Sequence, residues 1–398
     1  MSDKSVAFFI SHDSYLHVSC NLAPLFIRDG YDVKFILVSE ELSGAIGGSL
    51  VREIEISNLE LDELSFKYIS QLNCQILIAA VPPSILKAVS NVLHDCGQEY
   101  GSRPRLVTFF PGMLQEKRAE GMYERSYVDT LLLNSEYDYR VYQSAGRELG
   151  FETNNALVLG FLGRDSNIDG PCCDLSINAE EDKHILFIEQ QIMPNKLEDR
   201  VVLLEKLIDL AHRSDCNVVI KLRSNSGQSS SVSGYAYHFE DIFNFYKSKK
   251  LIPVNLKLSS LPIEEVIRNS SLCISVSSTV IFKSIAAGVP VAILSDFGIK
   301  DHYGNVHFVG SGCFVKLSAI NGNYRKLPDL NWTHDRMSFF NSIERSLSEE
   351  ILKFKMGGLV NPFKISENKA QLVNVANVKY FLVLNKIKLL FLRFLWNR

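Results

Sequence analysis

Three consecutive hydroxyl side chains, Ser277, Ser278 and Thr279, stand where an apolar run ends and a helical pattern begins. Leu272–Val276 reads as a buried strand, and Thr279–Ala287 carries apolar residues at helical spacing. The first turn of a helix presents unpaired N–H groups and the positive end of the helix dipole, and hydroxyls there add further donors. The pattern predicts an anion site, of the kind that binds phosphate. The alternative is that one serine simply caps the helix.

Two cations and two other polar residues follow neighbouring predicted strands. Lys221 and Arg223 end one apolar run, and Glu189 and Gln190 end another. A site that stabilises a departing anion without a metal needs N–H groups, hydroxyls and cations, so we expect Lys221 and Arg223 to join the hydroxyls in one ligand site. Glu189 and Gln190 are polar where their strand would enter the cleft, and we expect them to contact hydroxyls of the same ligand. Each cation could instead be a solvated charge, and Glu189 and Gln190 could lie in an exposed turn marked by Pro194.

Candidates for a catalytic base lie in the first part of the chain. His12 and Asp13 follow the apolar run Val6–Ile10, and Glu116 comes shortly after Pro111–Gly112. A base must reach the hydroxyl that it deprotonates, and both positions follow predicted strands. Asp13 and Glu116 are the preferred candidates. The alternative for each is an acid at a helix start, where it suits the helix dipole.

These residues would be positioned by alternating strands and helices. Short apolar runs alternate with helical patterns on both sides of a polar, aperiodic segment, which predicts two α/β domains, each a parallel sheet wrapped by helices. Two such Rossmann-like domains would face each other across a cleft. The predicted divisions are residues 1–165 (first domain), 166–182 (linker), 183–355 (second domain) and 356–398 (helical tail).

Several classes of protein are disfavoured by what the sequence lacks. It has no Gly-x-Gly-x-x-Gly after the first strand, no P-loop and no Gly-x-Ser-x-Gly elbow, which argues against dinucleotide, P-loop and esterase chemistry. A net charge of −3 over 398 residues argues against nucleic acid as a partner. The eight cysteines lack the spacing of a zinc site, and no Asp-x-Asp stands at a strand end, so no metal or cofactor is expected.

The residues carry a resemblance to a known family. Two α/β domains, with "SVSST" and "AAGVPVAIL" around a helix of the second, resemble a GT-B glycosyltransferase. The paired Ser-Ser/Thr motif is similar to that of bacterial transferases that use CMP-activated acidic sugars: sialic, pseudaminic or legionaminic acid, or Kdo. The sequence departs from the sialyltransferase pattern, because "IKLRSN" replaces the basic-x-His-Pro motif. This departure weighs against sialic acid more than against the donor class.

The resemblance implies a transferase that moves a nonulosonic-type sugar from its CMP ester to a surface glycan, such as capsule, O-antigen or a lipid-linked oligosaccharide. In that family the second domain, here 183–355, holds the nucleotide-sugar, with its phosphate at the helix that follows Ser277–Thr279. The acceptor docks on the first domain, here 1–165. Two enzymatic alternatives share the fold, a transferase that uses a UDP-sugar and a UDP-sugar 2-epimerase. A further alternative is a scaffold that binds the nucleotide-sugar without turnover.

The last predicted helix suggests a membrane contact. Lys379, Lys386 and Arg393 recur every seven residues among Phe, Leu, Ile and Trp, with no acid after Lys379. Such a helix suits an anionic lipid surface, and no apolar run is long enough to cross a bilayer. With no export signal near Met1, we expect a cytoplasmic protein, peripheral at the inner face of the membrane. The alternative is a tail helix packed on the first domain.

Overall fold

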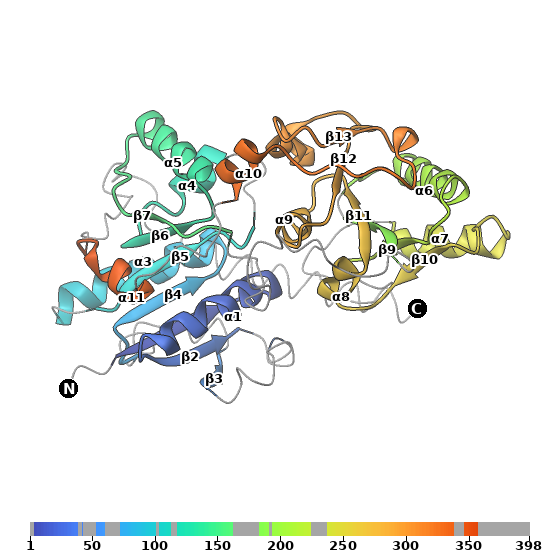
Figure 1. Ribbon diagram of the computed structural model, residues 1–398. Coiled ribbons are helices and arrows are strands. Elements are labelled where there is room, and N and C mark those ends of the chain that lie inside the picture. Colours follow the sequence, from blue (N-terminus) through green and yellow to red (C-terminus); the bar gives the residue numbers. More distant parts are fainter. Residues whose placement is uncertain are drawn as a thin grey trace, which may run out of the picture.

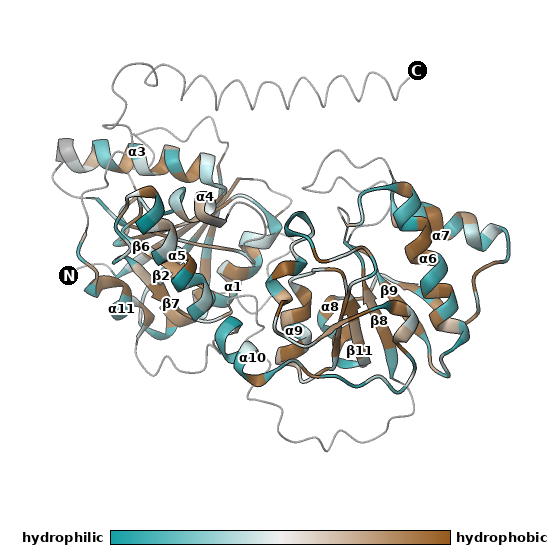
Figure 2. Cartoon of the chain, turned by 90° about the horizontal axis from the view of Figure 1, so that it is seen from above, coloured by the Kyte–Doolittle hydropathy of each residue, from teal (hydrophilic) through white to brown (hydrophobic). Residues whose placement is uncertain are grey.

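The computed structural model shows two α/β units side by side, joined in the chain between β7 and β8 (Figure 1). The strands are largely apolar, and many helices turn an apolar face to the interior and a polar face outward (Figure 2). The structure describes residues 4–38, 42, 53–59, 72–100, 103–112, 118–161, 183–190, 193–223, 237–337 and 346–356.

The first unit is built on a parallel sheet with the order β3-β2-β1-β4-β5-β6-β7. The chain leaves β1 toward β2 and β3 on one side and then returns to β4 on the other, so the strand order reverses between β1 and β4. Ligands of open α/β sheets bind at the carboxyl ends of the strands beside such a switch point. The strands are β1 (Ser5–Ile10), β2 (Asp32–Leu37), β3 (Ile54–Asn58), β4 (Ile76–Ala80), β5 (Arg105–Phe109), β6 (Thr130–Leu133) and β7 (Ala156–Val158).

Helices cover both faces of this sheet because alternate strand residues point to opposite faces. One core joins β1 residues such as Phe8 to α1 and α11, and the other joins Phe9 to α3, α4 and α5. Ser135 caps α5 by accepting from Asp138 N, and Gly150 ends it at φ 75°. The helices are α1 (Asp13–Arg28), α3 (Pro83–Tyr100), α4 (Arg118–Tyr123), α5 (Glu136–Leu149) and α11 (Leu347–Lys353).

The second unit repeats the plan with the parallel order β10-β9-β8-β11-β12-β13, whose switch point lies between β8 and β11. Helices α6 and α7 cover one face, and α8, α9 and α10 cover the other. Its strands are β8 (His184–Ile188), β9 (Val218–Lys221), β10 (Leu256–Ser259), β11 (Ser270–Ser275), β12 (Val291–Leu294) and β13 (Phe314–Val315). Its helices are α6 (Leu197–His212), α7 (Phe239–Ser248), α8 (Ile263–Arg268), α9 (Val280–Ala286) and α10 (Leu330–Arg336), with 3₁₀ turns at Asp301–Tyr303, Asn305–Phe308 and Leu317–Ala319.

The predicted fold class, two Rossmann-like units with parallel sheets, is confirmed. The predicted strand–helix–strand segment appears as β11, α9 and β12. Within the predicted second domain, 183–355, the structure adds a feature that the sequence did not suggest, because α11 packs with α1 on the first unit. The predicted linker, 166–182, and all but Met356 of the predicted tail lie outside the described residues.

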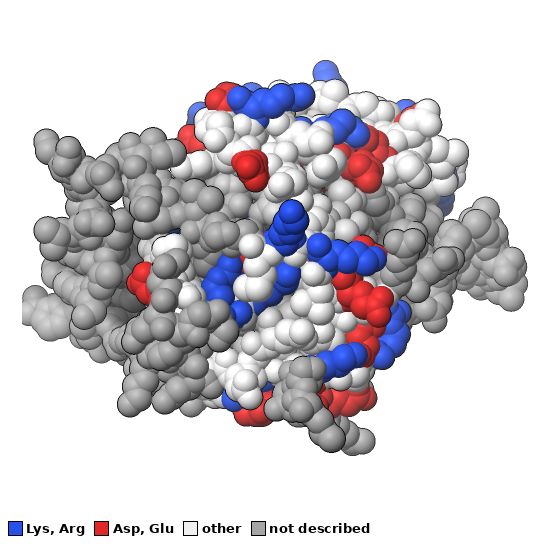
Figure 3. Space-filling view, turned by 90° about the vertical axis from the view of Figure 1, so that its left-hand side faces the viewer, with Lys and Arg blue, Asp and Glu red and all other residues white. Residues whose placement is uncertain are grey.

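Among the helices that the structure describes, none combines the length and apolar character needed to cross a membrane. On the side of the first unit seen in Figure 3, basic and acidic side chains are interspersed rather than gathered by sign.

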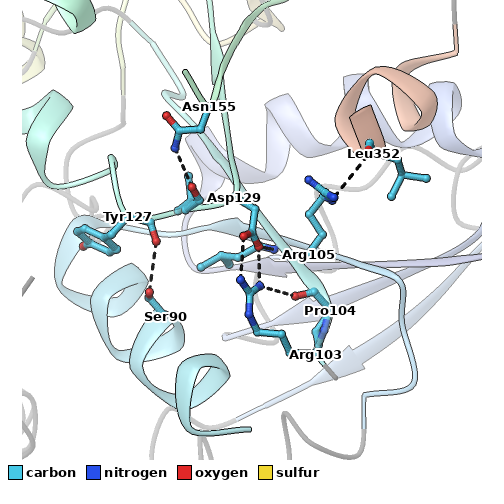
Figure 4. A network of polar contacts seen from close by, with 10 residues as sticks. Ser90, Arg103, Pro104, Arg105, Tyr127, Asp129, Asn155 and Leu352 are labelled. Atoms are coloured by element: carbon cyan, nitrogen blue, oxygen red, sulfur yellow. Dashed lines mark hydrogen bonds and ion pairs between the residues drawn. The ribbon is translucent and has the colours of Figure 1, made fainter. Parts of the chain in front are cut away.

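A buried carboxylate fastens α11 to the first unit. Asp29, at the end of α1, accepts from Ser346 Oγ (2.7 Å), Ser348 Oγ (3.0 Å) and Ser348 N (3.1 Å). Burial alone would raise the pKa of Asp29, but these hydrogen bonds outweigh burial and hold it below its usual value. Arg105, on β5, donates to the Leu352 carbonyl at the other end of α11 (Figure 4). The helix is therefore held at both ends.

We predict that Asp29→Ala lowers the free energy of unfolding by about 1–3 kcal/mol, because three donors lose their shared acceptor. Asp29→Asn keeps an acceptor oxygen and should cost less. Urea denaturation measures the loss, and amide hydrogen exchange should rise in 347–353. A carboxyl whose pKa is lowered on folding stabilises the folded state at any pH above its pKa in the unfolded chain, and this stabilisation is lost as the pH falls through its folded pKa. The difference in unfolding free energy between wild type and Asp29→Asn should therefore shrink in acid. Unchanged exchange in α11 of the Ala variant would contradict this clamp.

Candidate functional site

The turn between β11 and α9 is closed by its own serines. Ser275 Oγ accepts from Ser278 N at 3.2 Å and donates to the Ile188 carbonyl on β8 at 3.1 Å. Ser278 Oγ accepts from Val280 N at 3.2 Å. These hydroxyls therefore satisfy backbone groups at the start of α9, a local role that Ser fills well. Thr279, the third residue of the predicted anion site, is the half-buried residue at which the turn meets the first unit.

Gln190 locks this turn to the neighbouring strand. Its Oε1 accepts from Ser277 N at 2.8 Å, and its Nε2 donates to Ser277 Oγ at 3.1 Å. Gln190 follows β8 and Ser277 follows β11, so the two residues bridge the switch point of the second sheet. The Ser277 side chain is fully buried in this arrangement. Gln190 therefore fixes the backbone position of Ser277, the first residue of the predicted anion site.

Glu189 belongs to a buried ion pair beneath the same turn. Its Oε1 lies 3.2 Å from Arg200 Nη1, and both side chains are buried. Arg200 also donates to the Gln190 carbonyl at 3.3 Å, while Arg223 N donates to Glu189 Oε2 at 3.3 Å. The Arg223 residue is itself exposed. Sequence reasoning missed Arg200 because it stands among the polar residues of an ordinary amphipathic helix.

The two units meet at a polar cluster formed by His17, Lys221, Glu264 and Lys283, called the junction cluster below. Lys283 Nζ, on α9, lies 2.9 Å from His17 Nε2 on α1 and 2.8 Å from Glu264 Oε1 on α8. One helix turn earlier, the Thr279 side chain faces Gly112 of the first unit. A Cβ built on Gly112 would lie 3.0 Å from the Thr279 methyl group, so the two residues pack closely. One face of α9 therefore contacts the first unit.

Burial and neighbouring charges act in opposite directions within the junction cluster. Burial lowers the pKa of Lys221 from its usual value, although Glu264 acts in the opposite direction. Burial would raise the pKa of Glu264, but Lys283, with a hydrogen bond and its charge, holds it low. Both lysines therefore interact with the same carboxylate, Glu264. Only Lys221 of this cluster was predicted, since His17, Glu264 and Lys283 lie on separate helices whose spacing gives no sign that they meet.

The predicted base candidates lie at the edge of the first sheet that faces α9. His12 Nδ1 is 2.6 Å from Ser11 Oγ, and the His12 side chain is half-buried. Asp13 is exposed and accepts from Ser14 N at 2.7 Å, in the first turn of α1. His17, which contacts Lys283, follows in the same helix, so the first turns of α1 face the second unit. Glu116 lies outside the described residues.

Gly112 is held at the same edge of the first sheet. Asn134, after β6, donates from Nδ2 toward the carbonyls of Phe110 and Gly112 at 3.3 and 3.4 Å. The carboxyl ends of β1, β5 and β11 therefore converge on the junction. Within the described part of the chain, no cluster of three or more His, Cys, Asp or Glu residues has the arrangement of a metal site.

Known structures share this architecture. A protein described as "putative UDP-N-acetylglucosamine 2-epimerase from Listeria monocytogenes" is 12% identical, with a TM-score of 0.52 over 81% of this chain and 85% of that one. The UDP-GlcNAc 2-epimerase of Methanocaldococcus jannaschii, solved with UDP-GlcNAc and UDP, is also 12% identical, with a TM-score of 0.52 over 83% and 97%. A glycosyltransferase from Rickettsia africae is 14% identical, with a TM-score of 0.48 over 96% and 98%.

At these identities the likeness shows the fold alone, which is GT-B: two Rossmann-like units with facing sheet edges. No curated protein matched the sequence. One family model matches residues 7–351, which span both units from β1 to α11. The chain therefore belongs to the family described as "Putative glycosyltransferase (DUF6716)".

Proposed function

We propose that this glycosyltransferase moves an acidic, nonulosonic-type sugar from a CMP-activated donor to a surface glycan. The observation that carries the proposal is the turn at Ser277–Thr279, which Gln190 holds at the switch point of the second sheet, opposite the first turns of α1. Donor phosphate at this turn would face an acceptor held by the first unit. The family membership supports the transfer reaction.

The leaving group would be stabilised by groups already in place. When the glycosidic bond to the nucleotide breaks, negative charge grows on phosphate, and fixed N–H groups and cations lower that barrier. Thr279 stands at the start of α9, and Lys283 follows it on the same helix face. Lys221 lies nearby at the end of β9, where Glu264 influences its charge. In our proposal these residues hold the phosphate without a divalent metal.

The charge balance supports an acidic donor. A CMP-activated nonulosonic sugar carries one phosphate and one carboxylate, and the junction cluster sets two lysines against one carboxylate. Arg223 is exposed at the end of the same strand as Lys221 and could add a third cation. Surplus positive charge in a partly buried site favours an anionic ligand over a neutral one. A UDP-sugar carries two negative charges on its diphosphate as well, so this balance supports an anionic donor of either class, and the preference for the CMP-activated class rests on the Ser-Ser/Thr motif.

A UDP-sugar is the second candidate donor. The M. jannaschii epimerase of similar fold was solved with UDP-GlcNAc and UDP, so a UDP-sugar transferase or 2-epimerase stays open for this chain. Isothermal titration of the purified protein with CMP, UDP and GDP separates the candidates. Tightest binding of CMP would support our proposal, and tightest binding of UDP would replace it. Nucleotide binding without turnover in any acceptor mixture would select the scaffold alternative.

The membrane contact also remains a proposal. Lys379, Lys386 and Arg393 lie outside the described residues, so it rests on the sequence pattern alone. Deletion of 379–398 should abolish flotation with anionic vesicles and spare turnover on a soluble acceptor.

We predict that Lys283→Gln weakens nucleotide binding about 10-fold or more, because a partly buried cation facing phosphate is lost. The double variant Lys283→Gln/Glu264→Gln should remain weak, since it restores the charge balance but not the cation. Lys257→Gln, on an exposed edge-strand lysine, is the matched control. Isothermal titration calorimetry measures the nucleotide affinity of all three variants. Recovery of affinity in the double variant would show that Lys283 only neutralises Glu264.

Turnover should survive excess EDTA, because the proposed site relies on N–H groups and lysines. The measurement is transfer rate before and after chelation. Loss of turnover that Mg²⁺ or Mn²⁺ restores would overturn this part of the proposal.

Asp13→Asn should lower kcat by about 100-fold, as expected for loss of a general base, with nucleotide affinity unchanged. Glu116→Gln tests the second candidate and His12→Gln the third. Asp32→Asn, at an exposed position on the opposite edge of the sheet, is the control. Near-normal kcat in all three variants would place the base elsewhere.

A further inference from the structure

Arg125 is a buried cation in the first unit that the proposed reaction does not yet use. The residue is 5% exposed, and its guanidinium carbon lies 4.3 Å from the centroid of the Phe110 ring. Nη2 donates to Tyr15 Oη at 3.2 Å, and Nη1 makes a long contact of 3.4 Å to the Gly121 carbonyl. The buried Nε has no hydrogen-bond partner.

The charge of Arg125 has no counter-ion among the described residues. Its partners are a carbonyl and a phenol, and the phenol is neutral because burial raises the pKa of Tyr15 despite the nearby guanidinium. Other buried arginines differ in having an acid nearby, although Arg105 also has two nitrogens, Nε and Nη1, without a hydrogen-bond partner. Arg103 donates from both terminal nitrogens to Asp129, as Figure 4 shows, and Arg200 pairs with Glu189.

Arg105 lies close enough to the same Asp129 to feel its charge. Buried charges in folded proteins are ordinarily paired, because desolvation of a lone ion is costly. Arg125 does not follow that rule among the described residues, and an anionic ligand would supply the missing counter-ion.

The position of Arg125 points to the same conclusion. Tyr15 lies in the first turn of α1, after β1, and Phe110 directly follows β5. The guanidinium therefore sits at the carboxyl edge of the first sheet, beside its switch point, where open α/β sheets bind ligands. Gly112, two residues beyond Phe110, faces Thr279 of the second unit. An anion at Arg125 would thus lie on the first-unit side of the junction.

We propose that Arg125 is an acceptor-binding residue that pairs with an anionic group, a carboxylate or a phosphate, on the acceptor. The assignment of the first unit to the acceptor rests on the proposed function. A guanidinium binds either group through two parallel N–H···O hydrogen bonds. Nε is one of the nitrogens that can donate in this arrangement, and the Nε of Arg125 has no hydrogen-bond partner. Burial makes the pairing selective, because a neutral acceptor would leave the cation uncompensated. The acceptor class is then an acidic glycan or a phosphate-linked sugar.

The experiment uses the full-length chain and measures its melting temperature with glucuronate, glucose 1-phosphate or glucose at millimolar concentration. In the wild type, an anionic sugar should raise the melting temperature and glucose should not. A response to glucuronate alone assigns a carboxylate, and a response to glucose 1-phosphate alone assigns a phosphate. Arg125→Met, which keeps much of the apolar stem, should abolish the response, or weaken binding at least 10-fold by calorimetry. Arg125→Lys should retain part of it.

The ligand-free stability of the variants adds an independent readout. Arg125→Met should leave the melting temperature unchanged or raise it, because a desolvated charge without a partner is removed. Arg103→Met is the matched control and should lower the melting temperature markedly, because the buried Asp129 loses both hydrogen bonds from Arg103. A large drop in Arg125→Met that Glu116→Gln reproduces would identify Glu116 as an internal counter-ion and overturn the proposal. Equal response of wild type and Arg125→Met to the anionic sugars would also overturn it.

These results are separable from the proposed donor chemistry. Nucleotide affinity is measured on the same Arg125→Met protein and should match the wild type. If the wild type binds no nucleotide, the proposed function fails, whereas the sugar-anion response still reports on Arg125.

Discussion

The hydrogen bonds between Gln190 and Ser277 hold together the two segments that follow β8 and β11, from which the chain continues to opposite sides of the sheet. The chain leaves β8 toward one side of the second sheet and leaves β11 toward the other, which makes their carboxyl ends the switch point of this sheet. The Gln190 carboxamide bridges these ends, with the Ser277 N–H on its oxygen at 2.8 Å. Because Ser275 and Ser278 satisfy the remaining backbone groups of the turn, the start of α9 is fixed before any ligand arrives.

The fixed position of α9 determines how the two units meet. The half-buried Thr279, at the N-cap of α9, and Lys283, within α9, both contact the first unit, at Gly112 and His17. A second contact joins α5 to α10, where Arg140 forms two short bonds to Asp335, and the Arg336 guanidinium covers the Tyr137 ring. These contacts are largely polar, in the manner of interfaces that permit relative motion of domains. A ligand bound at the junction would touch both units, so its binding and their arrangement are coupled.

Buried charge is distributed unevenly across the molecule. Arg103 and Asp129 neutralise each other at the amino edge of the first sheet, and Arg200 and Glu189 do so beneath the turn of the second. Such pairs hold loops and strands in register at little net gain in stability. At the carboxyl edges the pairing is different, since Lys283 and Lys221 both interact with Glu264, and the partners of Arg125 in the described part of the chain are neutral. These cations lie where the two sheets converge, at the same edge as the exposed Asp13.

The sequence by itself determined the fold class and the β11–α9–β12 segment, because apolar periodicity and a glycine after the helix are local signals. It also placed Ser277, Gln190 and Glu189 at strand ends. It did not reveal that Gln190 binds the Ser277 backbone or that Glu189 pairs with Arg200, because residues 87 and 11 positions apart meet only after the sheet forms. His17, Glu264, Lys283 and Arg125 carried no local signal. Their chemistry depends on desolvation and on neighbours from other elements, and the tertiary structure alone supplies both.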